Sequence, residues 1–370
     1  MRISVVMPYF FPATVYGGPV FASYNLCKET ASLQAQIQVI TTDANGFKRL
    51  DAEVNSFQVL NNFKVKYCKE EIPKYFSFNF LLQLWNDLKD SEVVHVQSIY
   101  SYTTPIALIY SFFQNKKVCI SPRGSLAKWS FTKRGVLKKL WISLLIRPFV
   151  KKTVWLATSQ KEQDEIQYFF KTATIKILSD GVDIPVDFKL LNSKWSSQNY
   201  IAALGRIHKV KGYDLLIKSM RKLLDYDPSL KLLIAGNDEG DLDRLKRIVS
   251  DLSLQEQVRF VGSLHDEDKD QFLANAKCLV LPSHTENFGI VVAEALCLGT
   301  PVVASQNTPW SILETYKAGL HIENTADEIS KACITILENL DEYEKKTKLL
   351  AQQYDWKNIA IQYLKILKSI

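Results

Sequence analysis

Short apolar runs alternate with helix-like segments along most of the chain, and this alternation limits the fold more than any other feature. Runs of four to six apolar residues are typical of strands that are buried on both faces, as in a parallel sheet. The helices between such strands cover the two faces of the sheet. We therefore predict an α/β protein with parallel sheets. The expected strands are 3–7, 37–41, 65–68, 93–96, 118–120, 153–158, 199–204, 230–235, 258–261, 278–281 and 301–304.

The length of the chain and a polar stretch near its middle predict two domains. With 370 residues, 47% of them hydrophobic, the chain can form two full cores. We expect a Rossmann-like domain over 1–180, a linker over 181–198 and a second Rossmann-like domain over 199–353, facing each other across a cleft. The amphipathic segment 354–370 is expected to be a helix that packs back on the first domain.

Cysteine usage and the start of the chain favour the cytoplasm. The six cysteines are scattered without a CxxC pair, which argues against a disulfide framework and a zinc site. The first apolar run meets Pro8 too early for a secretory signal. We expect a cytoplasmic protein without a membrane span.

Positive charge is concentrated in the first half of the chain. Residues 1–180 hold 23 Lys and Arg against 13 Asp and Glu, a net of +10, and no acidic residue lies between Glu92 and Glu162. Basic, aromatic and leucine residues alternate over 129–152, which favours a peripheral contact with anionic lipid at the inner face of the cell membrane. The alternative is an amphipathic helix whose apolar side belongs to the core. No nucleic-acid motif accompanies the charge, so no nucleic-acid partner is expected. The candidate residues are Trp129, Lys133, Arg134, Lys138 and Lys139.

The stretch 282–294 carries the strongest functional signal. It leads from the strand 278–281 into a helix expected over 291–298, with Gly289 at the junction. The first amides of a helix lack internal partners, and the helix dipole leaves them partly positive. The backbone around Gly289 is therefore a candidate phosphate site.

Two carboxylates flank this candidate phosphate site. Glu286 precedes the helix and Glu294 lies about one turn inside it. Carboxylates repel phosphate but accept hydrogen bonds from hydroxyls. Hydroxyls on both sides of a phosphate describe a nucleotide sugar. The alternative is a pair of solvated glutamates beside a buried helix.

A second basic motif follows the strand 199–204. Arg206 comes directly after this strand, and Lys211 lies just before the next helix, so strand order would place both near the loop of Glu286. Two cations that converge on a diphosphate offset the charge that develops as it leaves, without a metal. Gly17 and Gly18 follow the first strand and would allow close backbone approach to a ligand, or form a plain tight turn.

No metal or dinucleotide motif is present. The first strand is not followed by GxGxxG, which disfavours a dinucleotide oxidoreductase. Asp-x-Asp triplets at 225–227, 241–243 and 266–268 are better explained as helix caps, and no histidines are paired at ligand spacing. His95 lies near the end of a first-domain strand and could face the cleft. The alternative is a structural histidine that is hydrogen-bonded within the domain.

These motifs together resemble one family. Glu286 and Glu294, with Phe-Gly between them, resemble the E-x7-E signature of the retaining glycosyltransferases of family 4, which have the GT-B fold. The pairs Gly205-Arg206 and Lys211-Gly212, the Gly17-Gly18 loop and the segments 95–97, 121–125, 180–183 and 299–304 also resemble motifs of this family, from residue 1 to about 370.

The resemblance implies a role for each motif residue. Arg206 and Lys211 would hold the donor diphosphate, Glu294 the ribose and Glu286 the transferred sugar. Gly18 would approach the diphosphate from the first domain, and Leu264 would lie near the base. The implied donor-binding residues are Gly17, Gly18, Arg206, Lys211, Leu264, Glu286, Asn287, Phe288, Gly289, Ile290, Val291 and Glu294, with Glu286, Arg206 and Lys211 as the catalytic set.

Two positions depart from the family pattern. Arg123 stands where many members have His, and Asp180 stands where the linker motif begins with Asn. Arg123 would bind a phosphate or an acceptor group but would not act as a base, because it stays protonated. His95 and Arg123 are therefore assigned to the acceptor side.

The family implies transfer with retention of anomeric configuration, by attack on the face from which the diphosphate leaves. The expected partners are a nucleotide-diphosphate sugar and a glycan or polyprenyl-linked acceptor of cell-surface polysaccharide or lipopolysaccharide synthesis. No cofactor or metal is expected. Two alternatives are a GT-B epimerase or synthase acting on soluble substrates and a catalytically silent nucleotide-sugar-binding subunit.

Overall fold

The computed structural model describes residues 1–72, 76–127, 135–185 and 188–370. It divides the chain into two compact units. Unit 1 comprises Met1–Gly181 together with Trp356–Ile370, and unit 2 comprises Val182–Asp355. The segment 181–198, expected to be a linker, is thus almost entirely part of unit 2.

Unit 1 is built on a sheet of eight described strands in the order β10-β9-β8-β7-β1-β2-β6-β5. Neighbouring strands are parallel except β5 and β6, which are antiparallel. The strands are β1 (Arg2–Val6), β2 (Gln36–Thr42), β5 (Phe57–Leu60), β6 (Phe63–Cys68), β7 (Val93–Gln97), β8 (Lys117–Ser121), β9 (Thr153–Ala157) and β10 (Thr174–Ile177), and a small ribbon pairs β3 (Ala44–Asn45) with β4 (Lys48–Arg49).

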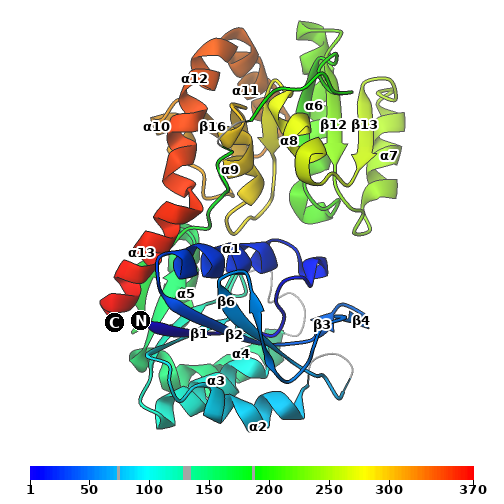
Figure 1. Ribbon diagram of the computed structural model, residues 1–370. Coiled ribbons are helices and arrows are strands. Elements are labelled where there is room, and N and C mark those ends of the chain that lie inside the picture. The colour runs from blue at the N-terminus through cyan, green and yellow to red at the C-terminus, as the bar shows by residue number, and fades with distance from the viewer. Residues whose placement is uncertain (73–75, 128–134, 186–187) are drawn as a thin grey trace. The chain divides into compact units, whose positions relative to one another are not determined.

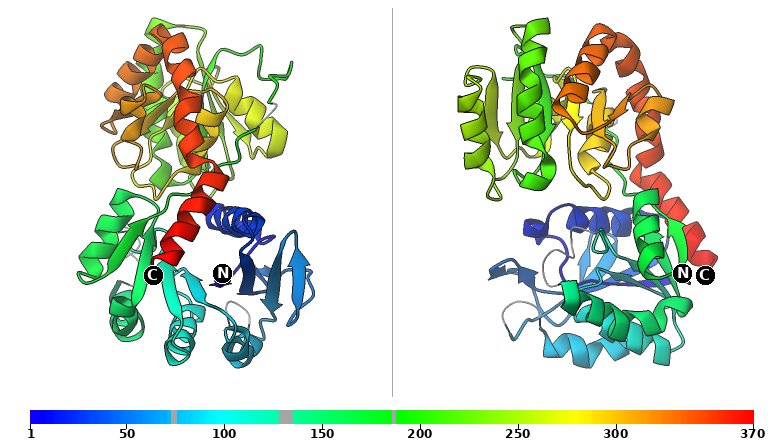
Figure 2. Two further views of the ribbon diagram at one scale, coloured as in Figure 1. Left: turned by 60° about the vertical axis from the view of Figure 1, so that its left-hand side comes forward. Right: turned by 180° about the vertical axis from the view of Figure 1, so that it is seen from behind.

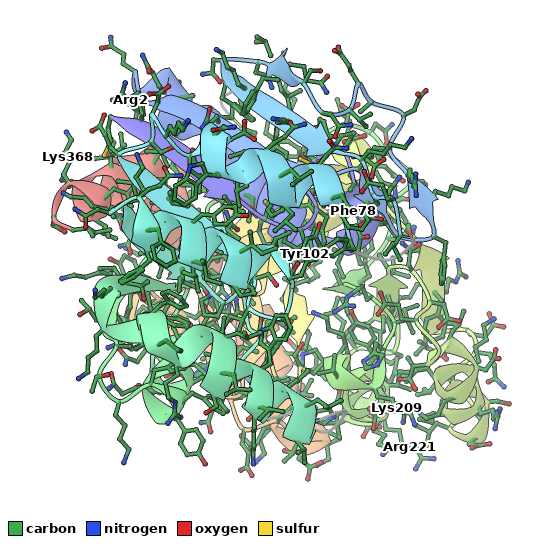
Figure 3. The ribbon with its side chains drawn as sticks, turned by 90° about the horizontal axis from the view of Figure 1, so that it is seen from below. Arg2, Phe78, Tyr102, Lys209, Arg221 and Lys368 are labelled. Atoms are coloured by element: carbon green, nitrogen blue, oxygen red, sulfur yellow. The ribbon has the colours of Figure 1, made fainter. Side chains whose placement is uncertain are left out.

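Helices cover both faces of this sheet (Figure 1). On one face, α1 and α13 pack side by side over a core of β1, β2 and β6, as the two views of Figure 2 also show. On the other face, α2, α3 and the helical segment after α4 enclose a second core. Figure 3 looks onto this second face, where Phe78 of α2 is labelled. The helices are α1 (Gly18–Ser32), α2 (Phe78–Asp87), α3 (Thr103–Phe113), α4 (Gly135–Trp141), α5 (Gln160–Phe169) and α13 (Trp356–Lys368).

Unit 2 is a three-layer α/β unit with a wholly parallel sheet in the order β13-β12-β11-β14-β15-β16. One core lies under α8, α9, α10 and α12, and the other lies under α6, α7 and α11. The strands are β11 (Tyr200–Leu204), β12 (Lys231–Ala235), β13 (Val258–Gly262), β14 (Leu279–Leu281), β15 (Val302–Ser305) and β16 (Gly319–Ile322). The helices are α6 (Tyr213–Tyr226), α7 (Leu242–Asp251), α8 (Asp266–Ala274), α9 (Ile290–Cys297), α10 (Ile312–Thr315), α11 (Ala326–Glu338) and α12 (Leu340–Ala351).

The chain passes between the units twice, at neighbouring points. The Val182 amide donates to the Tyr354 carbonyl over 2.7 Å, and Val182 forms a parallel bridge with Asp355. A side chain at Gly181 would place its Cβ 2.5 Å from the Trp356 ring, so this position requires glycine. Unit 2 is therefore an insertion whose two ends lie together.

Candidate functional site

Three loops of unit 2 meet where the carboxyl ends of β11 and β14 reach the edge of the sheet. Gly212 adopts a left-handed conformation (φ 66°), and a Cβ there would lie 2.1 Å from the Pro282 carbonyl oxygen. The same oxygen accepts a hydrogen bond from Asn324 Nδ2 over 2.8 Å. The His284 amide donates to the Val210 carbonyl over 2.8 Å. The loop before α6 and the loop before α9 are therefore held together by backbone contacts.

This arrangement brings two predicted site residues into direct contact. Lys211 Nζ donates to Glu286 Oε2 over 2.5 Å. Both side chains are largely shielded from solvent, with 13% and 18% of their areas exposed, so the charges interact strongly. Ser283 Oγ lies 3.4 Å from the same carboxylate oxygen. The ammonium and the carboxylate thus form one polar centre, although 75 residues separate them in the chain.

A buried tyrosine lies beside this ion pair. The Tyr213 side chain is fully buried, and its hydroxyl has no hydrogen-bond partner among the described residues. Burial raises the pKa of Tyr213, the nearby Glu286 carboxylate raises it further, and Arg206 lowers it. Tyr213 therefore stays neutral and lies within electrostatic range of both Glu286 and Arg206.

The N-terminus of α9 lies next to Glu286. Gly289 caps the helix in the left-handed region (φ 79°, ψ 63°), and a Cβ there would come within 3.0 Å of Glu286 Cγ. The Phe288 ring is buried against Trp310, and its carbonyl accepts a hydrogen bond from Trp310 Nε1 over 2.5 Å. Because the side chains of Phe288 and Val291 are buried in the core, a ligand at this stretch would meet the backbone and not these side chains.

Glu294 has a partner that sequence reasoning missed. Lys269 Nζ of α8 donates to Glu294 Oε1 over 2.9 Å, with 26% and 20% of the two side chains exposed. Burial lowers the pKa of Lys269, but the Glu294 carboxylate, together with the charges of Asp270 and Asp266, outweighs burial, and the net shift is upward. One oxygen of Glu294 is thus held by an ammonium group.

The remaining donor-side candidates of unit 2 lie nearer to solvent. Arg206 follows β11, is 60% exposed and pairs with Glu239 over 2.8 Å. Leu264 lies between β13 and α8, where it packs partly against the core under α9. Asn287 and Ile290 are half-buried at the start of α9.

Unit 1 places Gly17 and Gly18 at the N-terminus of α1. Gly17 has φ 73° and ψ −148°, a conformation that side chains disfavour. A Cβ at either glycine would meet no atom within 4 Å. Gly17 also closes a short 3-10 turn through its bond to the Thr14 carbonyl. The two glycines form a tight turn and also leave the backbone open to approach.

Arg123 and Asp180, the two departures from the family pattern, are bonded to each other. Arg123 Nη1 forms a largely buried ion pair with Asp180 Oδ1. Arg123 Nε also donates to Gln97 Oε1 over 3.2 Å. The backbone of Arg123 lies in the left-handed region (φ 55°), and the next amide, of Gly124, donates to the buried Glu162 carboxylate over 2.6 Å. Burial raises the pKa of Glu162. Three hydrogen bonds from Gly124 and Thr158 and the positive charge of Arg123 act in the opposite direction, but the net shift is upward.

His95 is enclosed in unit 1. Its ring nitrogens lie 2.8 Å from the Tyr363 hydroxyl and 2.8 Å from Ser121 Oγ. Burial and the nearby Arg123 lower its pKa to about 3, so the ring is neutral at physiological pH. This geometry fits the structural alternative, since both nitrogens are occupied by protein groups.

The basic segment forms α4, a π-helical turn over Ile142–Ile146 and a 3-10 segment over Arg147–Lys152. Ile142 and Ile146 are buried, whereas other apolar residues of the same stretch are exposed. Lys138 lies over the Tyr100 ring at 4.8 Å, and Lys139 is exposed. Trp129, Lys133 and Arg134 lie outside the described residues. The exposed apolar residues of the stretch are Val136, Leu137, Leu140 and Leu144.

The described residues contain neither a metal-binding cluster nor a membrane-spanning helix. No group of three or more His, Cys, Asp or Glu side chains is arranged to hold a metal ion. No described helix has the length and apolar character needed to cross a membrane.

Residues 191–367 match the family model of glycosyl transferases group 1. This part of the chain belongs to that family. It includes the Lys211–Glu286 pair, the N-terminus of α9 and Glu294, and it covers most of unit 2.

Individual relatives are similar to this chain in sequence, and a solved structure shares its fold. D-inositol 3-phosphate glycosyltransferase of Corynebacterium jeikeium is 29% identical over 45% of this chain and 44% of its own length. The phosphatidylinositol N-acetylglucosaminyltransferase gpi3 subunit of Schizosaccharomyces pombe is 22% identical over 99% of this chain and 80% of its own. The structure of Anabaena Alr3699/HepE in complex with UDP superposes with a TM-score of 0.76 and 17% identity, over the full length of both chains. The predicted GT-B fold, with two Rossmann-like domains, is confirmed.

In the glycosyl transferases group 1 domain, sequence reasoning found the motif residues and missed their partners. Lys269 and Tyr213 carry no local signal, because their positions depend on how α8 and α6 pack. The Arg123–Asp180 pair of unit 1 had a signal: two departures from one pattern with complementary charges. Sequence reasoning treated them separately because they lie 57 residues apart.

Proposed function

We propose that the chain is a retaining glycosyltransferase that moves a sugar from a nucleoside diphosphate onto an acceptor without a metal ion. The observation that carries this proposal is the Lys211–Glu286 ion pair at the N-terminus of α9. It joins a cation suited to phosphate, a carboxylate suited to hydroxyls and the N-terminal amides of α9 in one place. A structural neighbour binds UDP, which supports UDP as the first nucleotide to test.

In this proposal, Lys211 changes partner when the donor binds. The diphosphate competes with Glu286 for the Lys211 ammonium and also accepts hydrogen bonds from the amides at the start of α9. Glu286 then accepts a hydrogen bond from a hydroxyl of the transferred sugar. Glu294, held by Lys269, accepts from the ribose.

The chemical step is a displacement at the anomeric carbon. The bond to the diphosphate oxygen breaks while the acceptor hydroxyl attacks from the same face. The departing phosphate oxygen takes the proton of that hydroxyl. Lys211, Arg206 and the α9 amides stabilise the negative charge that develops on the leaving group. A covalent glycosyl-enzyme is not part of this scheme. Among the implied donor-binding residues, the only suitable nucleophiles are the carboxylates of Glu286 and Glu294, and the scheme assigns both to hydrogen bonds with hydroxyls.

Nucleotide binding tests the donor site. Thermal unfolding is measured with UDP, GDP and ADP, with and without Mg²⁺, on wild type and Lys211→Ala. A ligand at a hundredfold excess over its Kd stabilises by about 2.7 kcal/mol, which corresponds to about 5–10 °C for a unit of this size. We expect one nucleotide to give this shift without metal and Lys211→Ala to lose most of it.

Lys209→Ala is the matched control, because Lys209 belongs to the same turn but is exposed. It should retain the shift. A shift that requires Mg²⁺ would reject metal independence. The absence of a shift with all three nucleotides would reject the donor site. Retention is tested separately, by NMR of the anomeric configuration of the product.

We further propose a lipid-linked acceptor, with α4 of unit 1 contacting an anionic membrane surface. The acid-free stretch between Glu92 and Glu162 supplies the charge. The exposed apolar residues of α4 supply groups that would enter the interface; Val136 and Leu140 are 82% and 54% exposed. A curated relative is named for a phosphatidylinositol acceptor, which supports this class.

Vesicle sedimentation tests the membrane contact. The protein is mixed with phosphatidylcholine vesicles that contain either none or about a third phosphatidylglycerol. We expect binding to the anionic vesicles alone, and Val136→Ser with Leu140→Ser should weaken it about tenfold or more. Leu349→Ser, at a comparably exposed leucine of α12, is the control. Equal binding of all variants, or no binding by wild type, would reject the surface.

A further inference from the structure

A small cavity in unit 1 lies where ligands bind in sheets of this kind. It has a volume of about 60 Å³, enough for a few water-sized groups but not for a sugar ring. It lies at the carboxyl ends of β1, β7 and β8. In the sheet, β2 lies on one side of β1 and β7 lies on the other, so the strand order reverses at β1. Such a reversal of strand order is the usual ligand position. The lining residues are Met7, Pro8, Tyr9, Pro19, Gln97, Ser98, Pro122, Arg123 and Ser125.

The Gln97 side chain has one defined orientation in this cavity. Its Oε1 accepts hydrogen bonds from Ser23 Oγ over 2.7 Å and from Arg123 Nε over 3.2 Å. A guanidinium can only donate, so the atom that faces Arg123 must be the amide oxygen. The amide nitrogen is thereby fixed as the other terminal atom, and an amide flip would place two donors against each other.

The Gln97 Nε2 group has no hydrogen-bond partner among the described residues. The residue is only 2% exposed, so bulk water does not compensate for this. A buried donor without an acceptor is costly, and native proteins rarely retain one. An oxygen atom of a ligand in the cavity would satisfy it.

The charges around the cavity favour a neutral oxygen over an anion. Arg123 is the positively charged residue among those that line the cavity, and Asp180 neutralises it through their ion pair. The Glu162 carboxylate accepts from the amide of Gly124, directly after Arg123, and adds negative charge. A phosphate or carboxylate would thus meet no net positive charge, whereas a hydroxyl can accept from an amide nitrogen at little electrostatic cost.

We propose that the Gln97 amide nitrogen binds a neutral hydroxyl of a sugar in this cavity and determines which sugar unit 1 accepts. This rests on the proposed glycosyltransferase function. The hydroxyl belongs to the acceptor or to the transferred sugar of the donor. Arg123 acts as a positioning residue that fixes the orientation of the amide.

Gln97→Glu is the direct test, because it keeps an oxygen for Ser23 and Arg123 and replaces the free donor by a second oxygen. One arm measures calorimetric affinities for UDP, UDP-glucose, UDP-galactose, UDP-N-acetylglucosamine and GDP-mannose. The other arm measures binding of the methyl glycosides of glucose, galactose, mannose and N-acetylglucosamine by saturation-transfer NMR. Ser23→Ala is the matched control, because it removes one support of Oε1 and leaves Nε2 in place.

We expect Gln97→Glu to lose about tenfold to a hundredfold in affinity in one arm. Loss for a nucleotide sugar but not for its nucleotide assigns the hydroxyl to the donor; loss for a methyl glycoside assigns it to the acceptor. Equal affinities of wild type and Gln97→Glu in both arms, or no sugar bound by wild type in either, would overturn the proposal. Failure to bind any nucleotide would instead reject the proposed function. Should Gln97→Glu not fold, Gln97→Met replaces it.

Asp180→Asn tests the charge argument separately. Without the Asp180 carboxylate, Arg123 loses the partner of its ion pair and the cavity becomes more positive by one charge, so it should gain affinity for glucose 1-phosphate relative to methyl glucoside. An unchanged preference would overturn the assignment of a neutral ligand.

Discussion

The Lys269–Glu294 pair predicts a measurable coupling inside the proposed donor site. The two charged atoms are 2.9 Å apart. At an effective dielectric constant of about 20, the gross attraction at this distance is about 6 kcal/mol. About a quarter of each side chain is exposed, and the desolvation of the ammonium offsets most of the attraction. We expect a net coupling free energy of about 1–2 kcal/mol.

A double-mutant cycle isolates this coupling. The free energy of unfolding is measured in urea for wild type, Lys269→Met, Glu294→Gln and the double variant. Lys269→Met keeps the length of the side chain, and Lys269→Arg should restore most of the coupling. If Glu294 binds the ribose as proposed, the same variants should weaken UDP binding, because the carboxylate is then no longer held in place. The reasoning would be refuted if the loss of unfolding free energy in the double variant equalled the sum of the losses in the two single variants.

The pKa of Lys269 sets the pH range of this effect. Its pKa in the folded chain is raised above the ordinary 10.5. The folded chain therefore holds the proton more tightly than the unfolded chain, and the stabilisation is complete below pH 10.5 and lost as pH rises through the folded pKa. The difference in stability between wild type and Lys269→Met should be constant from pH 7 to 9 and shrink above pH 10.5.

Three further predictions follow from the described contacts. Gly289→Ala should lower the free energy of unfolding by about 1–2 kcal/mol, because Gly289 has a positive φ. It should also weaken nucleotide binding, because the added Cβ would press on Glu286. Thermal unfolding with and without UDP measures both effects. Because the pKa of His95 is lowered to about 3, the unfolded chain binds more protons below pH 6.5; stability should fall by about 1.4 kcal/mol per pH unit between pH 6 and 4, and His95→Gln should remove this part of the slope in urea titrations at each pH. Arg206→Ala should leave the melting temperature within about 1 °C, because its pair with Glu239 is a surface pair, and should weaken UDP binding about tenfold by calorimetry.

The sequence was sufficient to predict the layers and most strands, because strands buried on both faces are apolar throughout. It was insufficient for β16, where Gly319 replaces a β-forming residue because a Cβ would lie 2.0 Å from the Val302 carbonyl oxygen. The edge strand β10 was also missed, because its half-exposed residues lack an apolar run. The helices α11 and α12 were not assigned, although both carry an amphipathic pattern.

Sequence reasoning predicted that Lys211 and Glu286 would be near each other, since both follow the carboxyl ends of parallel strands. It did not predict that they form an ion pair, because this depends on the left-handed turn at Gly212 and its fit against Pro282. The roles of all site residues in binding or catalysis remain predictions. The orientation of Gln97 was equally out of reach, since Ser23 and Arg123 come from separate elements.

The return of the chain from unit 2 to unit 1 has a consequence for synthesis on the ribosome. The core of unit 1 includes Trp356, Ile359 and Tyr363, and Tyr363 also bonds to His95. These residues are translated about 170 residues after Gly181, which takes roughly 10–35 s at ordinary elongation rates. During that interval α1 and β1 lack the helix that covers them. Unit 2 can fold first, although it comes second in the sequence, and a nonsense codon just before Trp356 would destabilise unit 1, most of which is translated before unit 2.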